Sequence, residues 1–413
     1  MSAGDRARAV LDRLVRASGF ERFLISTSAL LLSILIGAVI VLVAGRMTTC
    51  STAATTYVGV GFCYDPVSVY DKLFLGAFGN ILENPINGQF ATTLAETTVL
   101  LFTGVAVALA FRAGVFNIGA QGQLVLGALA TAVVLGFVAP VFAGLGVVAT
   151  VVLVPLGILI GALAGGAYGA LPGALKAYAD ANEVITTIML NFVATSVALF
   201  LVSDPNWFKD PESAANQTVA LPEFAQFPTL LFAGRDDFSL IALAAGVLTL
   251  VGIWLLLTRT SFGYDLRTSG LQADAAEYGG VDAKRTIVSS MALSGALAGV
   301  GGAVYVLMIL GNYQVGVPSY GFDGITVSIL AGNHPLGVAA AALLFGVLKS
   351  GSIVVQVGSD VPPELVGVLR GLIILFVAMP EFFRLIGRRL VGPVAGEGKP
   401  MATDGGLGGD DDE

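Results

Sequence analysis

Long runs of apolar residues, separated by short polar segments, dominate this chain. The first run, 23–45, exceeds the roughly 20 residues that span a bilayer. Five arginines precede it, so the positive-inside rule predicts a cytoplasmic N-terminal segment over 1–22. The run is longer than the apolar core of a signal peptide, and no small-x-small cleavage site follows. We therefore expect a retained first transmembrane helix.

The same pattern predicts ten spans with both termini in the cytoplasm. Residues 46–93 form an extracellular loop with only Arg46 and Lys72 as cations, and residues 203–237 are an acidic extracellular loop. The uncharged stretch between Arg112 and Lys176 should hold two crossings, with a break near Pro140. The other predicted spans are 94–111, 183–202, 238–257, 286–310, 322–332, 336–348 and 364–380. The permease core is then 94–381, with a cytoplasmic loop at 258–285 and a cytoplasmic, acidic, disordered tail at 382–413.

Composition agrees with a membrane protein. Apolar residues make up 55% of the chain and charged residues 12%, which excludes an ordinary soluble domain. The net charge of −8 offers no basic footprint for nucleic acid. We expect an all-α polytopic fold in the cell membrane. The only cysteines, Cys50 and Cys63, share the first extracellular loop, where they form either a disulfide or two free thiols.

A polar word, Ala113 to Gln123, interrupts the apolar pattern with three amides and three glycines. Backbone at membrane depth leaves the helix only where protein or a water-filled cavity satisfies it, so this segment indicates a permeation pathway. A second interruption, 332–335, contains Pro335 and joins two short spans. Interruptions in both halves of a transporter favour a substrate path between inverted repeats.

Five polar residues are candidates for the substrate pathway. Glu183, Thr187 and Asn191 recur every four residues and so share one helical stripe. Asn117 and Gln121 belong to the polar word, whose Gln123 we assign to structure instead. The alternative for the stripe is an interhelical hydrogen bond, which is favoured for Glu183 near a membrane end. For Asn117 and Gln121 the alternative is that they satisfy the backbone of a broken helix. Glu96, early in its span, is expected to face the outer headgroups.

No G-x-x-x-x-G-K-[ST] sequence is present, so any ATP must be bound by another chain and we expect no cofactor in this one. The loop 258–285 is a candidate docking site for that ATPase. A short helix over 271–278 would end at Gly279–Gly280. Ala275 and Ala276 would give it a surface for close approach, just after Arg267. The alternative is a plain cytoplasmic connection.

This loop resembles the coupling segment of ABC-importer permeases of the branched-chain amino acid, simple sugar and nucleoside superfamily, T-x-F-G-x-x-L-R-A-x-G-x-N-x-x-A-A-x-Y-x-G-I. The matching residues are Thr260, Phe262, Gly263, Leu266, Arg267, Gly270, Ala275, Ala276, Tyr278 and Gly280. Gln272 and Val281 depart from the pattern. The polar word is similar to F-N-I-G-A-E-G-Q, with Gln121 in place of the acid. Residues 182–191 resemble N-E-V-I-x-T-I-M-L-N, and 333–337 resemble N-x-P-L-G.

The resemblance implies a type II ABC importer fold, and the nucleoside branch is the most similar one. It implies a second, homologous permease in a heterodimer, a separate ATPase subunit and an extracellular lipid-anchored binding protein. The chain would then be a pore-forming subunit and not an enzyme. Simple sugar or branched-chain amino acid import remain alternatives. A self-sufficient secondary transporter is the competing class, and the residues alone do not choose the substrate.

Overall fold

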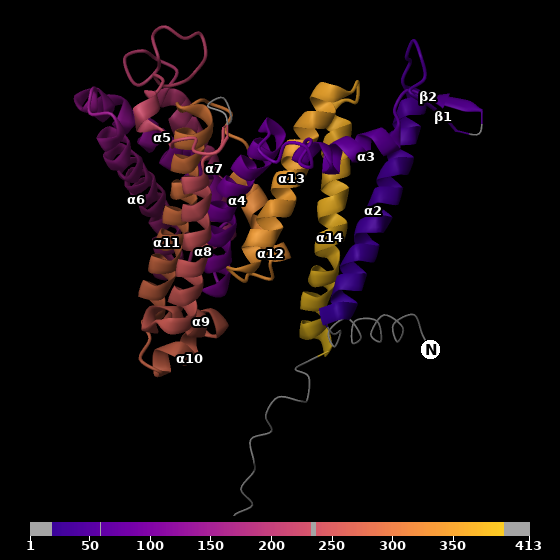
Figure 1. The fold of residues 1–413 in the computed structure, drawn as a ribbon. Coiled ribbons are helices and arrows are strands. Elements are labelled where there is room, and N and C mark those ends of the chain that lie inside the picture. Colours follow the sequence, from indigo (N-terminus) through magenta and orange to yellow (C-terminus); the bar gives the residue numbers. More distant parts are fainter. Residues whose placement is uncertain (1–18, 58, 233–236, 392–413) are drawn as a thin grey trace, which may run out of the picture. The chain divides into compact units, whose positions relative to one another are not determined.

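The structure is a computed structural model that describes residues 19–57, 59–232 and 237–391. The chain divides into two compact units. One contains residues 34–374. The other contains the described residues on either side, 19–33 and 375–391, which are helical. The fold and the sites below belong to the unit 34–374 (Figure 1).

The described residues are almost entirely helical. The helices are α2 (Gly19–Met47), α3 (Pro66–Phe74), α4 (Gly88–Arg112), α5 (Ala120–Val138), α6 (Val147–Ala179), α7 (Glu183–Leu201), α8 (Leu240–Arg259), α9 (Ser261–Leu271), α10 (Ala273–Tyr278), α11 (Ala283–Val304), α12 (Tyr320–Leu330), α13 (Gly337–Gly358) and α14 (Pro363–Val391). Short helical turns lie at η1 (Gly76–Phe78), η2 (Ala139–Phe142), η3 (Glu223–Ala225) and η4 (Tyr305–Leu310), the last a π-helical turn continuing α11.

Eight of these helices in the described residues are long and apolar enough to cross a membrane. They are α2, α4, α5, α6, α7, α8, α11 and α13, which confirms the all-α polytopic class. The two remaining predicted spans correspond to α14, of 29 residues, and α12, of only 11 residues. At 1.5 Å per residue α12 is about 16 Å long, roughly half of a hydrocarbon core.

Small residues bring the central helices into close contact. Gly157, Gly161, Gly165, Gly169 and Gly173 recur every four residues and so occupy one face of α6. This face packs against α11, where a Cβ on Gly165 would lie only 2.9 Å from the backbone nitrogen of Gly299. In membranes such contact between small residues takes the place of the hydrophobic driving force. With α4, whose most apolar stretch is 83% buried, α11 forms the centre of the unit.

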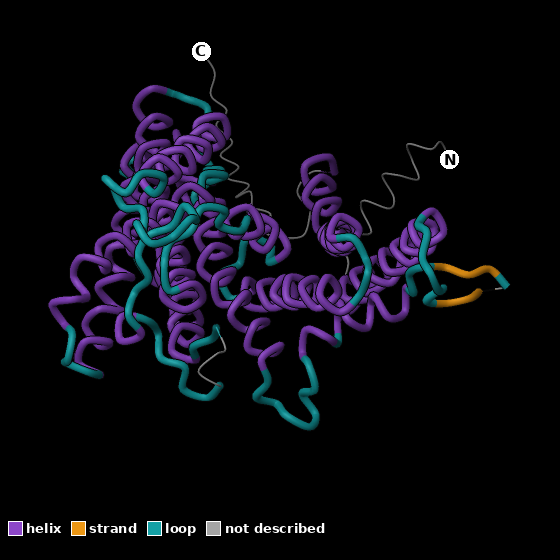
Figure 2. Tube along the Cα trace, turned by 90° about the horizontal axis from the view of Figure 1, so that it is seen from above, coloured by secondary structure: helices purple, strands orange, loops and turns teal. Residues whose placement is uncertain are grey.

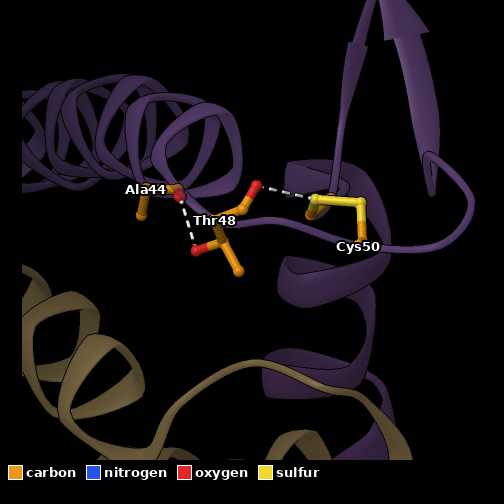
Figure 3. The surroundings of a disulfide bond; sticks show 4 residues. Ala44, Thr48 and Cys50 are labelled. Atoms are coloured by element: carbon orange, nitrogen blue, oxygen red, sulfur yellow. Dashed lines mark hydrogen bonds between the residues drawn. A yellow bond between two sulfur atoms is a disulfide. The ribbon is translucent and has the colours of Figure 1, made fainter.

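A short antiparallel hairpin follows α2. Strands β1 (Thr55–Tyr57) and β2 (Val60–Phe62) pair Thr55 with Phe62, and Figure 2 shows the hairpin extending away from the helices. A disulfide joins Cys50 to Cys63 beside it, and the carbonyl oxygen of Thr48 lies 3.2 Å from the Cys63 sulfur (Figure 3).

Several predicted boundaries were wrong. Helix α4 begins at Gly88, six residues before the predicted span, because the Asn87 side chain caps it by accepting from Phe90 N at 2.9 Å. Helix α13 does not end at residue 348 but continues to Gly358. The predicted disordered tail does not begin at residue 382, because α14 continues to Val391. Residues 1–18 and 392–413 of the predicted cytoplasmic termini lie outside the described residues.

Candidate permeation site

The chain leaves the helix between α4 and α5, at the predicted polar word. Gly114 adopts φ +72°, and the backbone stays irregular until α5 begins at Ala120. The amides of Asn117 and Gln123 bond each other reciprocally, at 2.8 and 3.1 Å. Asn117 also donates to Ser294 Oγ of α11 at 2.8 Å. This pair of amides is buried, and the bond to Ser294 joins the first break to α11.

Asn191 of α7 replaces the hydrogen bonds that the start of α5 lacks. Its Oδ1 accepts from Gly122 N at 2.8 Å, and its Nδ2 donates to Ile118 O at 2.9 Å. The first N–H groups of any helix have no partner within that helix, and at membrane depth each needs one. One side chain therefore satisfies a donor in α5 and an acceptor in the break just before it.

Gln121 connects this break to a second one, residues 311–319, which precedes α12. Its Oε1 accepts from Gly321 N at 2.8 Å, and its Nε2 donates to Pro318 O at 3.0 Å. The other end of the second break is held by the loop after α7, where Thr218 N donates to Tyr313 O at 2.9 Å. The segment 311–319 is therefore bonded to the loop after α7 at one end and to α5 at the other, where α12 begins.

Helix α12, which follows the second break, packs directly against α4. A Cβ on Gly324 would lie 2.8 Å from the carbonyl carbon of Thr103. Thr103 is nine residues, or about 13 Å, from the end of α4 at Arg112. The interruption predicted at 332–335 is present as the turn between α12 and α13, where Asn333 O accepts from Arg112 Nε at 2.8 Å. The segment that meets the polar word is 311–321.

The remaining two pathway candidates lie at the start of α7. Thr187 is fully buried, donates to Glu183 O at 2.6 Å within its own helix, and packs against Gly119. The Glu183 carboxylate pairs with Lys176 Nζ at 2.7 Å, which joins the end of α6 to the start of α7. All five candidates therefore have hydrogen-bond partners within the chain. Their contact with a solute remains a prediction.

The loop 258–285 contains two helices, where one was predicted at 271–278. The Thr260 hydroxyl caps α9 by accepting from Gly263 N at 3.0 Å, a start signal that the prediction missed. α10 ends at Tyr278, before the glycine pair. Ala276 is buried and Ala275 exposed, so only one of the two alanines packs inward. Leu271 and Tyr278 are 89% and 96% exposed, which leaves two large apolar side chains at the surface of this loop.

Helix α9 is in direct contact with the first break. A Cβ on Gly114 would lie 2.7 Å from Gly270 O, and a Cβ on Gly270 would lie 2.7 Å from Gly114 N. Only glycine at both positions permits this approach of the two backbones. The predicted loop and the predicted polar word, separated in sequence by about 150 residues, therefore form one connected structure.

Three charged residues inside the helices were not recognised as a site in the sequence. Lys349 of α13 lies 3.0 Å from Asp323 Oδ2 of α12 and 3.7 Å from Glu96 Oε2 of α4. Glu96 therefore does not face the headgroups as expected. A signal was present, because Lys349 and Asp323 both occur within apolar segments, where a charge indicates a functional site by default.

A bundle of membrane-length helices whose backbone leaves the helix at two points, each satisfied by a buried amide side chain, is typical of the class of polytopic transport proteins. Within that class, this chain belongs to the family of permease components of the branched-chain amino acid transport system, whose family model matches residues 89–378. This confirms the resemblance of the coupling loop and of the polar word.

Several curated relatives match most of the chain. The nucleoside ABC transporter permease protein NupB of Lactococcus lactis is 34% identical over 78% of this chain and 85% of its own length. The guanosine permease NupP of Bacillus subtilis is 32% identical, over 90% and 97%. The glucose permease TsgB13 of Haloferax volcanii is 32% identical, over 78% and 82%. A second permease from each of the first two organisms, NupC and NupQ, matches at 28%. No solved structure matches the chain significantly.

Proposed function

We propose that this chain is the membrane-spanning subunit of an ATP-driven importer of nucleosides. The observation that carries the proposal is the similarity to permeases named for nucleosides and for guanosine, which extends over 85% and 97% of their lengths. The family model, which matches residues 89–378, covers both the membrane helices from α4 onward and the loop 258–285. A self-sufficient transporter would have no need for a loop of this family pattern.

The proposed assembly contains a separate ATPase, a second permease and an extracellular, lipid-anchored binding protein. Two different permeases from each of two organisms match this chain, which supports a heterodimer. In the proposed orientation both termini and the helices α9 and α10 face the cytoplasm of the cell. The hairpin and the loop 202–239 then face outward, where the disulfide would be retained.

The proposed coupling begins at α9. ATP-driven closure of the partner ATPase moves α9, and the tight contact between Gly270 and Gly114 passes that movement to the first break. Because packed backbones are not compressible, the break must shift with α9. Asn191 holds the same break to α7, so α7 is the next helix to respond.

From the first break the movement reaches α12 through Gln121. This side chain bonds backbone groups of both Pro318 and Gly321, so the start of α5 and the start of α12 move together. Alternating access would then consist of opening and closing the bundle around these two breaks. Binding of solute within the bundle can be weak, because affinity can reside in the binding protein.

Glucose import is the second candidate, since a glucose permease is 32% identical over 82% of its length. The deciding experiment is uptake of labelled guanosine, glucose and leucine in cells with and without the gene. Loss of guanosine uptake, restored by the intact gene, is the expected result. Loss of glucose or leucine uptake with normal guanosine uptake would retain the permease and contradict the nucleoside proposal.

A further inference from the structure

One group of charged residues has no role in the coupling route above. Glu96, Asp323 and Lys349 come from three helices, α4, α12 and α13, and meet within the bundle. Their side chains are 14%, 18% and 10% exposed. A charge at membrane depth is costly, so a cluster of three needs a reason beyond helix packing.

The ammonium group of Lys349 is bound mainly to α12. It donates to Asp323 Oδ2 at 3.0 Å and lies 4.0 Å from the centre of the Tyr320 ring, a cation–π distance. Both partners are in the first turn of α12, beside Gly321, which Gln121 holds from the other side. Lys349 and Gln121 together therefore fix the start of this half-length helix.

Glu96 is different, because its contact with the same ammonium group is incomplete. Its Oε2 lies 3.7 Å from Lys349 Nζ, beyond hydrogen-bond distance, and this buried oxygen has no hydrogen-bond partner among the described residues. An unsatisfied buried carboxylate oxygen is rare and requires an explanation. The cluster holds two carboxylates for one ammonium group, and only Asp323 lies within hydrogen-bond distance of it, while Glu96 also interacts with the side chain of Tyr320 on α12.

The two carboxylates belong to different helices. Asp323 is on the short helix α12, and Glu96 is on the central helix α4. A shift of about 1 Å, within the usual range of helix movements, would bring Lys349 into bonding distance of Glu96. Separating a buried ion pair without a substitute is strongly unfavourable, and Glu96 would be that substitute.

We propose that Lys349 is a positioning residue of the transport cycle, which holds α12 through Asp323 in one state and exchanges this bond for Glu96 when α12 moves. The role of Glu96 is therefore to make the movement of α12 faster, and it is not needed to assemble the bundle. The inference goes beyond the proposed function, because it applies to whichever solute the wild-type chain transports.

The deciding variant is Glu96→Gln, which removes the second carboxylate and leaves the bond between Lys349 and Asp323 intact. It is compared with Asp323→Asn, which removes the engaged carboxylate, and with Glu83→Gln, a control in the exposed segment before α4. Uptake in cells is measured against solute concentration and normalised to the amount of chain in the membrane. Thermal stability is measured on the purified full-length complex.

Glu96→Gln should lower the maximal uptake rate about five- to tenfold, the scale of a typical coupling effect, with unchanged half-saturation and unchanged or higher thermal stability. Asp323→Asn should lower both uptake and stability. Wild-type uptake in Glu96→Gln would overturn the proposal. A parallel loss of stability and uptake in Glu96→Gln would also overturn it, because Glu96 would then be a static anchor. If the wild type transports glucose instead of guanosine, the nucleoside proposal fails but the same comparison is made with glucose.

Discussion

At the scale of single residues, amide side chains do the work that water does for broken backbone in soluble proteins. Asn191 satisfies a donor in α5 and an acceptor just before that helix, and Gln121 does the same at the start of α12. An amide is suited to this task because it carries both a donor and an acceptor on one rigid group. These residues therefore hold the broken backbone of the bundle together, whether or not a solute also contacts them.

Replacing Asn191 with alanine should destabilise the chain. The change leaves Gly122 N and Ile118 O without partners, at a cost of about 1–3 kcal/mol for each buried group. The thermal midpoint of the purified protein is the measurement. Asn206→Ala, at an exposed residue, is the control and should have little effect. An unchanged midpoint in Asn191→Ala would show that water readily takes over both bonds.

Tyr70 of α3 leads to the opposite prediction. Its hydroxyl is buried without a partner among the described residues, so Tyr70→Phe should not destabilise and should add up to about 1–3 kcal/mol. Burial raises the pKa of Tyr70 from 10.0 to about 12. The unfolded chain therefore loses this proton first, and the wild type should lose stability as the pH rises from 10 to 12.

The measurement is denaturation of the wild type and Tyr70→Phe at pH 8 and at about pH 11. Tyr70→Phe should be the more stable at pH 8, and its advantage should grow at about pH 11, where Tyr70 ionises in the unfolded wild type. Tyr57→Phe is the matched control, since its exposed hydroxyl donates to Asp65 at 3.2 Å. Equal pH dependence in the wild type and Tyr70→Phe would contradict the assignment.

At the scale of elements, the sequence located the helices well and their contacts poorly. The predicted break near Pro140 is present between α5 and α6, since apolar runs and proline are local signals. Lys349 was a misleading signal, because a charge usually ends a span and here an acid on another helix compensates it. The predicted interruption at 332–335 is present between α12 and α13, but the break at 311–319 was missed, because its satisfaction by Gln121 is a long-range contact that no local pattern contains.

The contact between α9 and the first break makes Gly270 a sensitive position. In Gly270→Ala the new Cβ would lie 2.6 Å from Arg112 O, so α9 must separate from the break. We expect uptake to fall about tenfold, with the amount of membrane-inserted chain unchanged. Gly252→Ala in α8 is the control, because no atom lies within 4 Å of its added Cβ. Equal uptake by both variants would exclude the proposed route from α9 to the break.

At the scale of the whole molecule, the three parts of the chain that the family pattern marks are physically continuous. The loop 258–285 touches the polar word through Gly270, and the polar word touches α7 through Asn191. The sequence predicted each part separately, and only the fold shows that they meet. A coupling route through the subunit follows from this continuity, with α12 as its last element.

Arg267→Glu should uncouple ATP hydrolysis from uptake in the complete importer. Arg267 is exposed on α9, and its charge repels that of Arg112 at the end of α4. A reversed charge therefore changes the surface offered to the ATPase and replaces this repulsion with an attraction. Uptake and ATP hydrolysis are measured together in membrane vesicles. Lys284→Glu, an exposed residue of the same loop, should retain uptake. Normal uptake in Arg267→Glu would count heavily against this docking assignment.

The bond between Cys50 and Cys63 has a consequence for how the chain is made. The cysteines are 13 residues apart and follow directly after α2. Disulfides form in oxidising compartments, so in the proposed orientation the ring closes only after α2 has crossed the membrane and the following segment has been exported. In a pulse-labelled nascent chain, the disulfide should therefore form soon after α2 is inserted and before most of the bundle has been synthesised. Its appearance would report the time at which the first helix crosses the membrane.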